Sequence, residues 1–158
     1  MWLRLFASLV LSGLVLTACG SSEKIGPPEI NYGRDVCIEC GMIIDDPRFA
    51  ATYRLDDGTE KVFDDLGGLI IRGRETDELE SAAVWVSDFD EETLIDATTA
   101  FFVPTVGVTS PMGHGILAFE DENRAQVIAM DLGGEVIRWD TVVELEVVDG
   151  LLGSHHDQ

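Results

Sequence analysis

Two cysteines and a methionine lie within six residues, Cys37-Ile38-Glu39-Cys40-Gly41-Met42, and no other stretch constrains the chain as strongly. The chain has only three cysteines and four methionines, so its sulfur is concentrated here. Thiolates and thioethers are soft donors, which favour Cu(I) over hard cations. A C-x-x-C pair alone also suits zinc, a disulfide or a redox pair, but thioether is not among the usual zinc ligands. The stretch therefore indicates a Cu(I) site. The alternative is a disulfide or free thiols beside a core methionine.

The chain is strongly acidic, with 30 Asp and Glu against 10 Lys and Arg and a formal net charge of −20. Its 158 residues indicate one domain or two small halves. Binding to nucleic acid or to an anionic membrane surface needs basic patches, so this balance argues against both. Two explanations of the acidity remain open: a source living at high salt, where screening weakens self-repulsion, or an ordinary acidic exported protein.

The N-terminus has the pattern of an export signal, with Arg4 followed by an apolar run over residues 5–16. This run is too short to span a bilayer, which takes roughly 20 residues. It ends in Leu16-Thr17-Ala18-Cys19-Gly20, which resembles the lipobox of bacterial lipoproteins. That resemblance implies a signal peptide over residues 1–18 and a lipid on Cys19, which anchors the exported protein to the extracytoplasmic (periplasmic) face of a membrane. The alternative is an ordinary signal peptide with an incidental cysteine.

The mature chain is expected to have three parts. Residues 19–33 contain Ser21, Ser22, Gly26, Pro27 and Pro28 and are expected to form a flexible spacer. A folded domain is expected over residues 34–150, followed by a loose tail over residues 151–158. With Cys19 lipidated, Cys37 and Cys40 are the only free thiols, in a compartment where disulfides form.

Turn signals and apolar spacing predict a hairpin followed by a helix in the first half of the domain. Strands are expected over residues 49–55 and 60–63, with a turn at Asp56-Asp57-Gly58. Asp64 or Asp65 is expected to cap the helix, which ends at about Arg72. Gly67 and Gly68 each weaken this helix by roughly 1 kcal/mol relative to Ala, so their presence indicates close backbone packing.

The second half is expected to contain further strands and two more helices. The strands are expected over residues 83–86, 94–97, 100–103, 116–119 and 136–139. Asp121 is expected to cap a helix that ends at Gly133-Gly134 and places Met130 in the core. Asp140 is expected to cap a last short helix.

The two halves resemble each other weakly. Phe63-Asp64-Asp65 leads into the first helix and Phe119-Glu120-Asp121 into the second. A stretch with sulfur and glycine lies upstream of each, Cys40-Gly41-Met42 in the first half and Met112-Gly113-His114 in the second. Their spacings differ, so this is no strict repeat. The pattern predicts an α+β fold of two related strand–strand–helix units, each presenting a loop with a soft donor.

Taken together, these motifs resemble the NosL family of lipid-anchored copper-binding accessory proteins of nitrous oxide reductase. The resemblance rests on the lipobox, C-x-x-C-G-M, Phe63-Asp64-Asp65, Trp85-Val86, and Pro111-Met112-Gly113 with Phe119 downstream. It implies two strand–strand–helix units with antiparallel sheets, a fold related to a domain of organomercurial lyase. It also implies a non-enzymatic metallochaperone with Cu(I) as cargo, and nitrous oxide reductase or its membrane assembly machinery as partner.

The family's metal-binding motifs fall on Cys40, Met42 and Met112, with Cys37 and His114 as additional candidate ligands. A mixed Cys and Met set suits a carrier, because neutral thioethers hold copper more weakly than a closed cage of thiolates. For Met112 the alternative is core packing. Asp64 and Asp65 are expected to be helix caps, because carboxylates suit harder ions.

Three other functions fit part of the pattern. Cys37 and Cys40 with Asp64 as proton donor could cleave a carbon–mercury bond, as in organomercurial lyase. Cys37 and Cys40 could also serve thiol redox, although such an enzyme sets C-x-x-C between a strand and a helix, whereas Gly41 and Pro47 indicate a loop here. A structural zinc module is short of ligands, because His114 is the only histidine within the expected domain.

Overall fold

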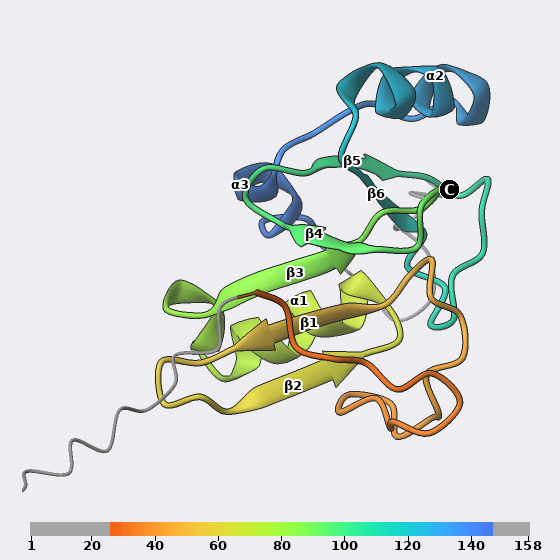
Figure 1. The fold of residues 1–158 in the computed structure, drawn as a ribbon. Helices are drawn as coiled ribbons and strands as arrows, with labels where there is room; N and C mark the ends of the chain where they lie inside the picture. The colour runs from red at the N-terminus through yellow and green to blue at the C-terminus, as the bar shows by residue number, and fades with distance from the viewer. Residues whose placement is uncertain (1–25, 147–158) are drawn as a thin grey trace, which may run out of the picture.

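The polypeptide forms two antiparallel sheets, each packed against a helix (Figure 1). The computed structural model describes residues 26–146. The strands are β1 (Ala51–Arg54), β2 (Glu60–Phe63), β3 (Ala83–Ser87), β4 (Leu94–Asp96), β5 (Phe101–Pro104) and β6 (Ile116–Phe119). The helices are α1 (Leu66–Glu75), the 3-10 helix η1 (Glu78–Glu80), α2 (Glu122–Leu132) and α3 (Trp139–Val142). The larger sheet has the order β2-β1-β3-β4, and the smaller one pairs β5 with β6.

The first strand–strand–helix unit is β1, β2 and α1. The hairpin pairs Ala51 with Phe63 and Arg54 with Glu60. Its turn contains Gly58 at φ 86°, a conformation that glycine adopts without strain. The helix extends three residues beyond the predicted end, to Glu75. The predicted hairpin and helix are confirmed.

The second unit is β5, β6 and α2. The two strands pair from Phe101 with Phe119 to Pro104 with Ile116. Asp121 caps α2 by accepting from the Arg124 N–H at 2.7 Å, and Gly133 ends the helix in the left-handed region. The predicted α+β class, with two related strand–strand–helix units, is confirmed.

A short parallel bridge joins the two units. Asp88 directly follows β3 and pairs with Ala118 of β6, and the Phe89 N–H donates to the Ala118 carbonyl at 2.9 Å. The Asp88 carboxylate also accepts from the Glu120 N–H at 2.7 Å. These bonds fix the second unit against the end of the larger sheet, above it in Figure 1.

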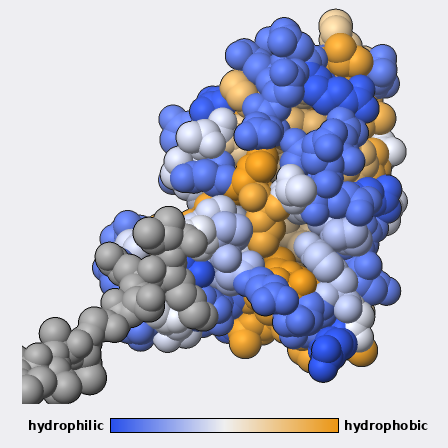
Figure 2. Space-filling view, viewed as in Figure 1, coloured by the Kyte–Doolittle hydropathy of each residue, from blue (hydrophilic) through white to orange (hydrophobic). Residues whose placement is uncertain are grey.

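Each unit has its own apolar cluster. The larger cluster lies between the four-stranded sheet and α1 and includes Ile44, Tyr53, Phe63, Leu69, Ile70 and Val86. The smaller one lies between β5–β6 and α2 and includes Phe49, Val103, Leu117, Phe119, Ala125 and Ala129. The face shown in Figure 2 is mostly hydrophilic, in agreement with the net charge.

The predicted strand over residues 136–139 is wrong. Only Ile137 pairs with β5, through two hydrogen bonds of 2.9 Å with Phe102, because the chain then turns into α3. This turn carries Trp139 onto Phe102, with ring centroids 5.9 Å apart. Asp140 is not the cap of α3 either; Arg138 occupies that position, and the Asp140 carboxylate accepts from the adjacent Thr141 N–H.

Two further predictions are wrong. Met130 is 75% exposed, because α2 turns Ala125 and Ala129 toward the sheet and Met130 away from it. The spacer expected over residues 19–33 does not continue to residue 33: Ile30 is buried, and the Gly26 carbonyl accepts from Arg54 at 2.8 Å. The expected signal peptide, Cys19 and the tail from residue 151 lie outside the described residues.

No helix within residues 26–146 has both the length and the apolar character needed to cross a membrane.

Candidate metal centre

The sulfur stretch forms a tight loop closed by a bridge between Val36 and Ile43. Inside the loop, the Cys37 N–H donates to the Met42 carbonyl at 2.8 Å, and the Gly41 N–H donates to the Cys37 carbonyl at 3.0 Å. Gly41 adopts φ 74°, which a glycine reaches without strain. The loop buries Cys37 and leaves Cys40 partly accessible.

Bonds to the first unit hold this loop in place. The Ile38 N–H donates to the Val62 carbonyl at 3.0 Å. From α1, the Arg72 guanidinium donates to the Ile38 carbonyl at 3.2 Å and forms an ion pair with Glu39 at 3.0 Å. Both residues between the cysteines are therefore bonded to neighbouring elements.

Asp64 completes a cluster with the two cysteines, which corrects its prediction as a cap. The ligand atoms of Cys37, Cys40 and Asp64 all lie within 4.8 Å of one another. The Cys40 thiol donates to Asp64 Oδ2 at 3.3 Å, while the buried Oδ1 has no hydrogen-bond partner within residues 26–146. Buried polar atoms are normally hydrogen-bonded. Asp64 faces the cysteines because the next residue, Asp65, already caps the helix.

Burial raises the pKa of the Cys40 thiol to about 12. Hydrogen bonds with Cys37 and Asp64 act in the same direction, whereas the Met42 N–H, which donates to the sulfur, acts in the opposite one. Cys40 is therefore protonated at neutral pH without metal. Because a metal binds the thiolate, loading this loop must release a proton.

Asp65 connects the second unit to the start of α1, next to the cysteine loop. Its carboxylate caps α1 by accepting from the Gly67 N–H at 2.7 Å, which confirms its prediction as a cap. The same carboxylate accepts from the Ser110 hydroxyl and, at 3.2 Å, from the Met112 N–H. One buried side chain thus fixes the loop over residues 110–115 against the start of α1.

The two glycines at the start of α1 make room for that loop. A Cβ on Gly68 would lie 2.8 Å from Met112 Sδ and 3.6 Å from Glu39 Cβ, so Met112 lies over Gly68 beside the cysteine loop. A Cβ on Gly67 would lie 2.3 Å from His114 Cγ, so the imidazole packs directly on the helix backbone. The close packing predicted from these glycines is confirmed.

His114 is 2% exposed, and neither ring nitrogen has a hydrogen-bond partner among the described residues. A buried imidazole without partners is unusual and leaves both nitrogens free to meet a ligand. Met42 differs, because its side chain is 50% exposed at the surface of the loop.

The structure therefore brings Cys37, Cys40 and Asp64 together, and it places Met112 against Gly68 and His114 against Gly67 at the start of α1, with Met42 exposed on the cysteine loop. The main prediction gave Asp64 only as a helix cap, although the organomercurial-lyase alternative placed it with Cys37 and Cys40 as a proton donor. The available signal was the adjacent pair of acids before the helix: since one carboxylate suffices for the cap, the second was free for another role.

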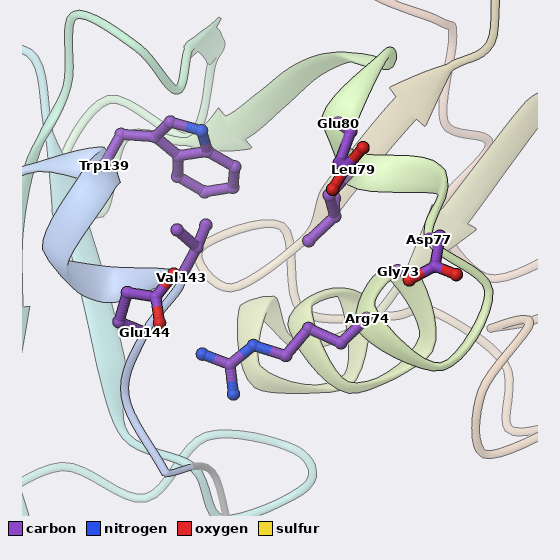
Figure 3. A pocket seen from close by; sticks show the side chains of 8 residues that line it. All are labelled: Gly73, Arg74, Asp77, Leu79, Glu80, Trp139, Val143 and Glu144. Carbon is purple, nitrogen blue, oxygen red and sulfur yellow. The ribbon is translucent and has the colours of Figure 1, made fainter.

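A separate pocket of about 290 Å³ lies between α1, η1 and α3. Figure 3 shows Trp139, Leu79 and Val143 around it, with Arg74 at one side. None of the described residues that line it carries sulfur, so its chemistry does not match that of the cysteine loop.

Comparisons with known proteins match most of the chain. The NosL family model matches residues 29–147. The copper-binding lipoprotein NosL of Stutzerimonas stutzeri is 29% identical over 147 residues, covering 84% of this chain and 76% of that protein. The crystal structure of the copper chaperone NosL from Shewanella denitrificans matches with a TM-score of 0.64 at 22% identity, covering 73% of this chain and 93% of that one. At this identity the structural match supports the fold.

Proposed function

Because the chain belongs to the NosL family, we propose that it is an exported, lipid-anchored carrier that binds Cu(I) and delivers it for maturation of nitrous oxide reductase. The family membership confirms the resemblance drawn from the C-G-M and P-M-G motifs. The names of the two relatives, a copper-binding lipoprotein and a copper chaperone, support a role in carrying copper without catalysis.

The observation that carries the proposal is the meeting of soft donors from both units at the start of α1. Cys40 contacts Asp64 there, and Met112 lies over Gly68, four residues along the chain from Asp64. Thiolate with thioether selects Cu(I) over hard cations. In this proposal Cys40 from the first unit and Met112 from the second unit bind the ion, with Cys37 beside Cys40 and the buried His114 as further candidate ligands.

Release is as important as binding for a carrier. Thioethers are neutral and weaker ligands than thiolates, so a mixed set leaves the ion exchangeable. The exposed Met42 side chain suits the first and last contact with the ion, because it reaches solvent from the same loop. Cys40, which is protonated when free, favours release wherever a proton is available to replace the metal.

Lipid anchoring at Cys19 places the carrier at the membrane where the reductase and its assembly machinery receive copper. The lipobox over residues 16–20 supports this part of the proposal. Intact-mass analysis of the membrane fraction should find diacylglycerol on Cys19. A soluble protein cleaved at another position would contradict the anchor and leave copper binding unaffected.

Competition titration of the reduced chain against a chromogenic Cu(I) chelator tests the carrier. We expect Cys40→Ser to weaken Cu(I) binding by about a hundredfold or more, roughly 2.7 kcal/mol. Cys37→Ser is the matched control, and it should retain most of the affinity while abolishing the disulfide that air oxidation forms. Undiminished binding by Cys40→Ser, or by the oxidised wild type, would contradict the proposal.

The cluster of Cys37, Cys40 and Asp64 also favours a second candidate, an organomercurial-lyase-like enzyme. There the two thiols would bind mercury and the acid would protonate the leaving carbon. Incubation with methylmercury and excess thiol distinguishes the two functions: we expect no methane, and turnover that requires Asp64 would favour the enzyme.

A further inference from the structure

Five large apolar side chains are exposed around the cysteine loop, and together we call them the apolar rim. Their exposed fractions lie between 38% and 55%. The members are Tyr32, Val36, Ile38, Met42 and Ile43. Among the described residues only three other large apolar side chains are this exposed, Val106, Val127 and Met130, so most of these side chains lie on the cysteine loop or near it in sequence. Contiguous exposed apolar patches on soluble proteins commonly mark interaction sites.

The backbone that carries the apolar rim is bonded in place. Val36 and Ile43 are partners in an antiparallel bridge, so their side chains lie side by side on one face. Ile38 is held through its N–H by Val62 and through its carbonyl by Arg72. The side chains thus face solvent from a fixed backbone, as a preformed docking surface requires. The loop lies at the lower right of Figure 1, where Figure 2 shows apolar residues among hydrophilic ones.

The charges around the apolar rim select the partner. Residues 29–48 contain five acids and two arginines; Asp46 is paired with Arg48 at 2.7 Å and Glu39 with Arg72 at 3.0 Å. The three other acids outnumber the exposed Arg34, and two of them, Glu29 and Asp45, are exposed close in sequence to Tyr32 and Ile43. A second copy of this chain would bring the same acids against each other within a net charge of −20, and an anionic membrane would repel them. A partner with an apolar centre and a basic border complements this surface.

We propose that the apolar rim docks the copper-receiving protein through an apolar patch bordered by Lys or Arg, and so brings the receiving ligands directly over Cys40. This inference rests on the proposed function, because it names the surface through which that delivery takes place. Docking excludes water around the loop and aligns the exposed Met42 with the partner's ligands, so that the ion moves between sites without entering solution.

Two measurements on the same variants test it. The first is Cu(I) affinity by competition titration. The second is the rate at which the copper-loaded chain transfers copper to apo nitrous oxide reductase in membranes from cells lacking the chain, followed as copper content of the purified reductase. The rim variant is Ile38→Ser with Ile43→Ser. The matched control is Val127→Ser with Met130→Ser, two exposed apolar residues on α2, at the other end of the molecule in Figure 1.

We expect the rim variant to keep its Cu(I) affinity and to transfer copper at least about tenfold more slowly, while the control transfers at the wild-type rate. Asp45→Lys should also slow transfer, and Asp45→Asn should slow it less, because the border on the partner is basic. Transfer by the rim variant at the wild-type rate would overturn the inference.

Other outcomes separate the alternatives. A wild-type chain that dimerises in sedimentation, with the rim variant monomeric, would assign the rim to a second copy and overturn the inference. Binding of the unlipidated chain to phosphatidylcholine–phosphatidylglycerol vesicles through the apolar rim would show that the rim binds lipid. This result would also overturn the inference. Failure of the wild type to bind Cu(I) would reject the proposed function itself, and the docking surface with it.

Discussion

Met112 is the candidate soft donor from the second unit of the chain. Its N–H is held by Asp65 at 3.2 Å, and its sulfur lies over Gly68 beside the cysteine loop. Met130 provides a contrast, because the same residue type on exposed α2 contacts no part of this centre and is 75% exposed. Position within the fold, rather than residue type, distinguishes a candidate ligand from a surface methionine.

Replacing Met112 with Leu tests this donor with little change in volume. Such swaps usually cost less than about 1.5 kcal/mol of stability, so the fold should be retained. We expect Cu(I) affinity to fall at least about tenfold, roughly 1.4 kcal/mol, in competition titration. Met130→Leu is the matched control and should bind as the wild type does. If His114 is the third donor instead, His114→Ala should cause the larger loss and Met112→Leu almost none.

Gly68→Ala tests the same arrangement from the helix side. Ala is favoured over Gly in a helix interior by about 1 kcal/mol, so α1 itself gains stability. The added Cβ would lie 2.8 Å from Met112 Sδ, which forces that side chain away from the cysteine loop. We therefore expect thermal stability close to that of the wild type and a clear loss of Cu(I) affinity. Equal affinity in the two proteins would show that Met112 does not need its position over Gly68.

At the scale of elements, η1 follows α1 and is hydrogen-bonded to the β1–β2 hairpin. Glu78 accepts from the Lys61 ammonium at 2.7 Å and from the Tyr53 hydroxyl. The Lys61 bond, followed by the Tyr53 bond, lowers the pKa of Glu78 to about 2 from its ordinary value of 4.5. The folded state therefore favours the Glu78 carboxylate, and η1 is held to the sheet by charge.

This contact makes a prediction about stability and pH. Because the folded pKa is depressed, the contribution of Glu78 is complete above pH 4.5 and is lost as the pH falls from about 4.5 to about 2. The side chains of Glu78 and Lys61 are both partly exposed, so we expect Glu78→Gln to cost on the order of 1 kcal/mol at pH 7 and clearly less at pH 2, by urea unfolding. Glu80→Gln, in the same turn but exposed, is the control. A pH-independent cost would show that the contact is not electrostatic.

Local sequence signals predicted an element correctly where the tertiary packing favours the same structure. Asp57-Gly58 and Asp121 gave the hairpin turn and the cap of α2, because turn and cap chemistry depends on neighbours in sequence. Residues 136–139 have the pattern of a strand but form only one bridge, because the chain turns into α3 after Ile137 and carries Trp139 onto Phe102. The burial of Ile30 was not predictable from its Pro- and Gly-rich surroundings, since it belongs to the larger apolar cluster, whose other members come from distant segments.

At the scale of the whole molecule, the candidate centre lies where the two units meet. The C-G-M and P-M-G motifs identified the sulfur residues from sequence. The role of Asp64 required the structure, because only the fold shows that Asp65 takes the cap and Asp64 turns to Cys40. Likewise, sequence spacing could not show that Asp65 holds the second unit through Ser110 and Met112. Under the proposed function, copper binding across this junction would make the site depend on the complete fold.

X-ray absorption at the copper edge of the Cu(I)-loaded chain tests this central claim most directly, because it counts the sulfur atoms around the ion. We expect a shell dominated by sulfur in the wild type, one fewer sulfur ligand in Met112→Leu, and an unchanged shell in Met130→Leu. Loss of one sulfur ligand in Cys40→Ser would show that Cys40, from the first unit, belongs to the same ligand shell. An identical shell in the wild type and Met112→Leu would contradict the account, because the copper would then be bound by the first unit alone.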